Sequence, residues 1–157
     1  MIDKDAINKK IEKLKEYLVL LEGYRKSSLK ELEEDLTLQG AVRCYLQLSI
    51  ECVIDVGEII ISGLRLPQPE EARGVIEVLG KHKIIPISFA EHFAAVAGFR
   101  NILVHEYAKV DINKLYKHLK EDLQDFDFYA KCIAQYIKKN PPRLSKLKPA
   151  LPKKKKR

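Results

Sequence analysis

The chain has 157 residues, of which 46% are apolar and 32% are charged. This length fits one domain, and the composition excludes collagen-like, low-complexity and wholly disordered chains. No run of about 18 uncharged apolar residues occurs, which excludes a membrane-spanning helix, and the first residues lack the apolar stretch of a signal peptide. We therefore expect a cytoplasmic protein, and its three cysteines fit a reducing compartment.

The net charge of +7 is concentrated at the C-terminus. Ten of the 29 basic residues lie between Lys138 and Arg157, where no acidic residue occurs, so the rest of the chain carries 19 basic against 22 acidic residues. This segment holds four of the seven prolines and few large apolar side chains, which predicts a folded domain over residues 1–140 and a disordered basic tail over 141–157. The tail is either a phosphate-binding arm for RNA or another anionic surface, or a solubilising tail without a partner.

The spacing of apolar residues predicts an all-α chain. Apolar side chains recur every three or four positions, and strand-like alternation and Asn-Gly or Asp-Gly turns are missing. The expected helices are, in chain order, 3–23, a short connecting helix opened by the capping box of Ser28 and Glu31, 37–62, a short helix over 70–81, a helix opened by a second capping box of Ser88 and Glu91, and a long last helix from 112 to about 140. The helix over 37–62 is apolar over a wide arc, so we expect it to be the most buried. The predicted fold is an antiparallel bundle of four main helices plus one or two short ones.

Residues 99–107, FRNILVHEY, contain the constellation with the clearest chemical meaning. Arg100, His105 and Tyr107 form the pattern R-x4-H-x-Y, which this composition produces by chance about 0.01 times. Imidazole titrates near neutrality and can move the protons of RNA phosphodiester cleavage, and a guanidinium can hold the charge that grows on the non-bridging oxygens. We expect neither a metal nor a cofactor, since the sequence has no zinc-ligand spacing and no Gly-rich phosphate loop.

The geometry of this motif leaves alternatives open. On a straight helix Arg100 and Tyr107 share a face, whereas His105 lies about 140° away from Arg100. Either the helix loosens before the histidine, or the two groups converge by pairing with another chain, which would also supply a second histidine for the second proton transfer. In the non-catalytic interpretation, His105 caps the helix C-terminus, Arg100 pairs with a carboxylate such as Asp55, and Tyr107 packs against its neighbours.

The motif and its surroundings resemble the HEPN superfamily, in particular the HepT-like ribonuclease toxins. The resemblance extends over the opening amphipathic helix, the segment AVRCYLQLSIECVIDVGEII with Asp55 at the acidic position of the family, the segment GFRNILVHEYAKVD and the long last helix. The basic tail after Asn140 lies outside it. The resemblance implies a dimerising, HEPN-like helical bundle with Arg100 and His105 of both protomers in one cleft, and Asp55 and Asn101 are further candidates for lining that cleft.

The resemblance also implies a function. Proteins of this family cleave RNA without metal, and their partner is a nucleotidyltransferase antitoxin of the MntA type that transfers AMP to the motif tyrosine, here Tyr107. The added phosphate and bulk would block the cleft beside Arg100 and His105. We therefore expect a metal-independent endoribonuclease toxin of a type VII-like toxin–antitoxin pair that cleaves RNA by attack of the 2′-OH. The alternatives are a non-catalytic nucleotide- or RNA-binding companion of a nucleotidyltransferase, and an interaction protein that acts through its basic tail.

Asp55 itself allows two interpretations. It either lines the cleft and orients Arg100 or His105, or it belongs to the polar stripe of an amphipathic helix. Among the other titratable residues, we expect His118 to be a solvated surface residue because it lies among lysines, and His92 to be partly buried beside an apolar position.

Overall fold

The computed structural model describes residues 1–105 and 111–139, without the side chain of His105. These two ranges contain seven helices and no strand, which confirms the all-α class. The helices are α1 (Lys4–Tyr24), α2 (Leu29–Glu34), α3 (Leu36–Gly63), α4 (Ala72–Lys81), α5 (Ile87–His105), α6 (Ile112–Glu121) and α7 (Leu123–Lys139). Four of them are long, as predicted, and three are short rather than one or two. The expected basic tail over 141–157 lies outside the described residues.

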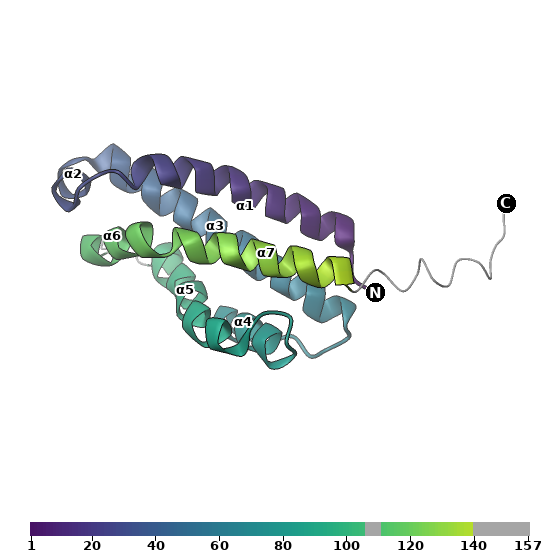
Figure 1. Cartoon of the computed structure of the whole chain (residues 1–157). Helices are drawn as coiled ribbons and strands as arrows, with labels where there is room; N and C mark the ends of the chain where they lie inside the picture. The colour runs from purple at the N-terminus through teal and green to yellow at the C-terminus, as the bar shows by residue number, and fades with distance from the viewer. Residues whose placement is uncertain (106–110, 140–157) are drawn as a thin grey trace, which may run out of the picture.

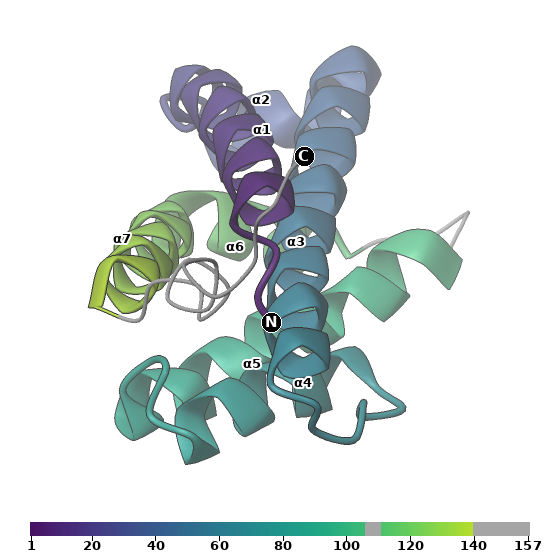
Figure 2. The same cartoon turned by 90° about the vertical axis from the view of Figure 1, so that its right-hand side faces the viewer.

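Helix α3 forms the centre of the bundle. It packs most extensively against α1 and also contacts α4 and α5. Figure 1 shows the long helices α1, α3, α5 and α7 running in alternating directions, as an antiparallel bundle requires. Figure 2 shows α4 and α5 below the α1–α3 pair, with α7 at the side. Eleven residues of α3 are buried, more than in any other helix of the described part of the chain.

Side-chain caps explain where several helices begin. Ser28 and Glu31 form the predicted capping box, in which the Glu31 amide donates to Ser28 Oγ and the Ser28 amide donates to Glu31 Oε1. Asp111 is the predicted N-cap of α6, and its Oδ1 accepts from the backbone of Asn113 at 2.9 Å. The second predicted capping box is wrong, because α5 already begins at Ile87 and Ser88 lies inside its first turn.

The predicted long last helix is two helices, α6 and α7, separated by Asp122. The Asp122 side chain turns back to the Nδ1 atom of His118, and its carbonyl accepts from the amide of Asp125 to open α7. Apolar residues such as Leu119 and Leu123 are buried on both sides of the break, so the hydrophobic stripe continues across it. The apolar spacing predicted a single helix because the buried stripe is continuous and only one polar residue, Asp122, marks the end of the first helix.

Close contacts in the core fix α5 against its neighbours. Phe93 of α5 packs edge-on against Phe126 of α7, with ring centroids 5.6 Å apart, and both are fully buried. A Cβ added to Gly80 of α4 would lie 2.4 Å from the Cβ of Ala90 in α5, so glycine is needed for this close approach. In the described residues, none of the helices has the length and apolar character that a bilayer span requires.

Candidate functional site

The last turns of α5 carry the described part of the motif. Helix α5 is continuous from Ile87 to His105, so of the two alternatives left open by the sequence, a helix that loosens before the histidine is not observed. Arg100 and His105 therefore keep an angular separation of about 140° within one chain. Tyr107 and the side chain of His105 lie outside what the structure describes, so their roles stay predictions.

Arg100 is half-buried on α5. Its Nε atom is buried and has no hydrogen-bond partner among the described residues. Leaving a buried donor unpaired costs about 1–3 kcal/mol, and more for a charged group, so buried donors in folded proteins nearly always have acceptors. An oxygen atom brought by another molecule, such as a phosphate oxygen, would complete the hydrogen bonding of this guanidinium.

Arg43 of α3 ties the end of α5 to the centre of the bundle. Its Nη2 atom donates to the carbonyl oxygen of Leu103 at 3.0 Å. The last carbonyls of a helix have no partner within the helix, so a guanidinium from a neighbouring helix satisfies one of them. This residue was not among the predicted site residues, although a lone arginine in the apolar segment AVRCYL was a signal for it.

His118 packs beside the motif, contrary to the solvated position predicted for it. Its ring stacks on Phe99, with centroids 4.0 Å apart and an angle of 22° between the planes. Its Nδ1 atom contacts the Oδ2 atom of Asp122, and the two side chains are 21% and 9% exposed. Phe99 precedes Arg100, so this contact holds α6 against the motif-bearing turn of α5. His92, predicted to be partly buried, is instead 66% exposed and bonds Asp125.

Arg73 of α4 brings another guanidinium to α5. A Cβ added to Gly98 would lie 3.2 Å from the Cγ atom of Arg73, so the stem of this arginine lies across the α5 backbone two residues before Arg100. Three arginines from three helices thus contact or belong to the second half of α5. In the described ranges, no group of three or more His, Cys, Asp or Glu side chains is placed to hold a metal ion.

The structure does not bring Asp55 to Arg100. Its Oδ2 atom is 2.9 Å from Lys10 Nζ of α1, and this hydrogen bond and charge raise the pKa of Lys10. Asp55 lines, with Lys10 and Glu58, a surface cavity of about 500 Å³ between α1 and the end of α3. Within one chain its contacts therefore follow the polar-stripe interpretation. Asn101 is exposed on α5, next to Arg100.

Comparisons with known proteins point to one family. A family model described as ribonuclease HepT-like matches residues 7–133. The tRNA nuclease HepT of Aphanizomenon flos-aquae is 28% identical over 136 residues, which are 87% of this chain and 92% of that protein. The mRNA nuclease HepT of Shewanella oneidensis is 26% identical over 103 residues, which are 66% of this chain and 77% of that protein.

A solved structure shares the fold. The tri-AMPylated HEPN toxin of Shewanella oneidensis, solved in complex with an MNT antitoxin, superposes with a TM-score of 0.76 at 24% identity, over 85% of this chain and 99% of that one. The family match runs from α1 into α7 and includes the whole R-x4-H-x-Y segment. It confirms the resemblance on which the sequence prediction was based, and the chain belongs to the ribonuclease HepT-like family.

Proposed function

We propose that this chain is a metal-independent endoribonuclease toxin. The observation that carries the proposal is the family match over residues 7–133, a range that contains Arg100, His105 and Tyr107. The buried Nε donor of Arg100 supports it, because it suits an anionic oxygen from outside the chain. The two relatives described as nucleases act on tRNA and on mRNA, so RNA is the substrate class we assign.

The proposed reaction is a transesterification within RNA. His105 of one protomer takes the proton of the 2′-OH, whose oxygen attacks phosphorus. The bond to the 5′-oxygen breaks, and this oxygen receives a proton from the second histidine of a symmetric dimer. Arg100 holds the non-bridging oxygens as charge develops on them. The products are a 2′,3′-cyclic phosphate and a 5′-hydroxyl end.

The proposed regulation is by a nucleotidyltransferase partner of the MntA type. The Shewanella oneidensis toxin with this fold is tri-AMPylated and bound to an MNT antitoxin. In this chain the acceptor would be Tyr107, two residues beyond His105. AMP on that hydroxyl would bring negative charge and bulk to the site where RNA phosphate binds. Asp55 and Asn101 remain candidates for lining the cleft of the dimer.

The first test is cleavage of RNA in EDTA by purified chain whose mass shows no AMP. His105→Ala is compared with His82→Ala, which removes an exposed histidine at the end of α4. We expect the wild type and His82→Ala to produce 2′,3′-cyclic phosphate ends and His105→Ala to produce none. Equal cleavage by His105→Ala would refute the assignment of the histidine. Retention of RNA without product in all three proteins would instead favour the non-catalytic binding companion.

A further inference from the structure

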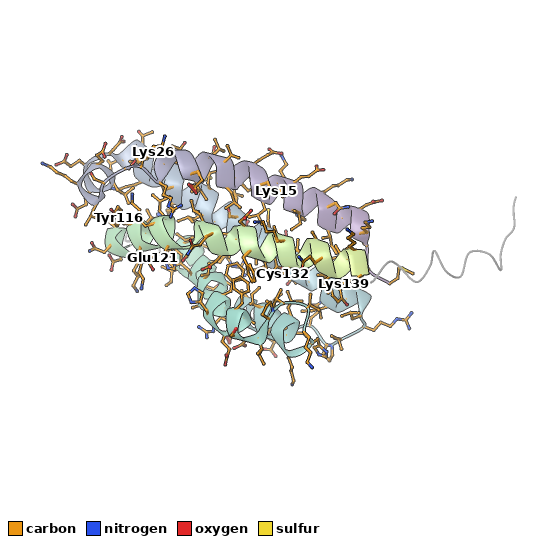
Figure 3. All side chains as sticks on the ribbon, viewed as in Figure 1. Lys15, Lys26, Tyr116, Glu121, Cys132 and Lys139 are labelled. Carbon is orange, nitrogen blue, oxygen red and sulfur yellow. The ribbon has the colours of Figure 1, made fainter. Side chains whose placement is uncertain are left out.

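A groove of about 640 Å³ lies at the end of α5 opposite to His105. Its walls come from the end of α4, the turn into α5 and one side of α7. Figure 3 shows two of its lining residues, Cys132 and Lys139, along α7. The start of α5 and His105 are separated by 18 residues, or roughly 27 Å of helix rise. The groove is therefore distinct from the motif.

The rim of this groove is basic and its floor is apolar. Four lysines line it, and none of its lining residues in the described part of the chain is acidic; these lysines are Lys81, Lys83, Lys131 and Lys139. Lys131 forms an ion pair with Asp127, but both side chains are more than half exposed, so the pair is weak and easily exchanged. Phe128 and Ile87 are 42% and 66% exposed, which leaves apolar surface open beside the lysines.

Phe128 is a positioned aromatic platform. Its ring packs edge-on against Phe89, with centroids 4.7 Å apart, and Phe89 in turn stacks on the fully buried Phe93 at 4.8 Å. The ring is thus held from one side and open on another. Exposed aromatic rings next to basic side chains are the arrangement with which proteins bind single-stranded nucleic acids, since bases stack on the rings and phosphates bind the cations.

Lys83 has a backbone conformation that favours glycine. Its φ is +61°, and it follows the C-cap of α4 in a Schellman motif, with hydrogen bonds from Lys83 to Gly80 and from Ile84 to Leu79. A side chain in this left-handed region is strained, and such strain is concentrated at functional positions. Here the strained residue presents a lysine at the rim of the groove.

Helix α7 ends at the rim of this groove, where the basic run of the sequence begins. Lys139 is the last residue of α7 and lines the groove, and the sequence from Lys138 to Arg157 carries ten basic residues and no acidic one. Positive charge therefore continues from the groove into the segment that follows it. This continuity favours a polyanion longer than one phosphate as the occupant.

We propose that this groove is an exosite for single-stranded RNA, in which the lysines hold phosphates and a base stacks on Phe128. The inference rests on the proposed ribonuclease function, because it concerns RNA bound outside the scissile site. At roughly 3.4 Å per stacked nucleotide, about eight nucleotides separate the groove from the motif. An RNA much shorter than this stacked length does not bridge the two places.

The test compares Lys83→Gly with Arg65→Gly. Arg65 has a φ of +59° in the turn after α3, so both changes relieve the same strain and remove one positive charge, but Arg65 does not line the groove. The probe is a fluorescent 2′-O-methyl RNA of about 16 nucleotides, which lacks the nucleophile and stays intact. We expect Lys83→Gly to weaken binding roughly three- to tenfold and to lower the salt slope by about 0.7, while the thermal midpoint stays constant or rises in both variants.

Two further measurements sharpen the result. Phe128→Leu keeps apolar volume but removes the π face, and should weaken binding of the long RNA at least about fivefold. A probe of about four nucleotides cannot use the groove and the motif together, so Lys83→Gly should weaken its binding less than it weakens binding of the long probe. Equal affinities of Lys83→Gly and Arg65→Gly for the long probe would overturn the exosite. Weakened binding of an acidic protein partner by Lys83→Gly, without any effect on RNA, would also overturn it.

Failure of the exosite and failure of the proposed function give different results. The affinities above are measured on uncleavable RNA, so they do not depend on catalysis. Cleavage of the same sequence with free 2′-OH groups by the wild-type chain is measured in parallel. If the wild-type chain cleaves RNA and Lys83→Gly and Arg65→Gly bind the long probe equally, only the exosite is refuted. If Lys83→Gly alone binds the probe more weakly and no variant cleaves RNA, only the ribonuclease assignment is refuted.

Discussion

Removing His118 should destabilise the fold through its contacts with Phe99 and Asp122. Asp122 is only 6% exposed, so without His118 a buried carboxylate loses its partner. A hydrogen bond to a charged group contributes about 1.5–3 kcal/mol, and an aromatic stack about 0.5–1.5 kcal/mol beyond burial. His118→Ala should therefore lower the free energy of unfolding by about 2–4 kcal/mol. For a chain of this size that corresponds to a fall of roughly 5–15 °C in the thermal midpoint.

The structure supplies a matched control with the same chemistry and different burial. His92 Nε2 lies 3.0 Å from Asp125 Oδ2, but the His92 side chain is 66% exposed. Exposed ion pairs contribute about 0–1 kcal/mol, so His92→Ala should change stability little. Stability is measured by urea unfolding of His118→Ala and His92→Ala. The same measurement on Asp122→Ala and on the His118→Ala/Asp122→Ala double variant gives the coupling energy between His118 and Asp122. Equal losses in His118→Ala and His92→Ala, or a coupling below about 0.5 kcal/mol, would refute the reasoning.

Three further predictions follow from particular residues. Gly98→Ala should stabilise the protein by up to about 1 kcal/mol, because the flexible Arg73 side chain that lies over Gly98 can move aside. Gly80→Ala should destabilise it by about 1–3 kcal/mol, because the new methyl group would meet Ala90 on the rigid helix α5. Thermal unfolding of the two variants measures both effects. Burial raises the pKa of the Cys52 thiol from 9.0 to about 11, so iodoacetamide at pH 8 should alkylate the exposed Cys44 before Cys52, as followed by mass spectrometry. The free energy of unfolding should also fall between pH 9 and 11, because the Cys52 thiol loses its proton at a lower pH in the unfolded chain than in the folded one. Deleting residues 141–157 removes eight basic residues and should flatten the salt dependence of RNA affinity; equal slopes would exclude an RNA-binding role for the tail.

Local signals in the sequence predicted the helices well. The capping box of Ser28 and Glu31 and the N-cap Asp111 are contacts within three residues, so a single stretch of sequence contains both partners. The same reasoning was wrong at Asp122, because the buried stripe continues across the break and hides it. It was wrong at Ser88 because the helix begins one residue earlier, directly after proline.

Contacts between distant residues could not be predicted in this way. His118 lies among lysines in the sequence, and its partner Phe99 is 19 positions earlier, so only the packing of α6 on α5 makes it part of the site. The bond from Arg43 to Leu103 joins residues 60 positions apart. The left-handed conformation of Lys83 is set by the end of α4 and the turn into α5, and nothing in its own side chain indicates it. Such features depend on how helices meet, which periodicity does not specify.

The continuity of α5 bears directly on how the proposed ribonuclease assembles its site. Positions 100 and 105 lie about 140° apart round one continuous helix, so we expect a site that uses both residues to be assembled from two protomers. A symmetric dimer would pair Arg100 of one protomer with His105 of the other. In a heterodimer of Arg100→Ala and His105→Ala chains, every pair within a chain is broken, whereas one pair between chains is intact.

Mixing these two inactive variants therefore separates the arrangements. If pairing between protomers is required, an equal mixture that exchanges subunits should cleave RNA faster than either variant alone, because about half of the dimers are mixed and each has one intact pair. The gain should stay below about a quarter of wild-type cleavage, because a mixed dimer has a single histidine and water must take over one of the two proton transfers. Subunit exchange is verified by native mass spectrometry of chains with different tags, and each variant alone is the control. An exchanged mixture that is no faster than either variant alone would refute cleavage by a single Arg100–His105 pair between protomers.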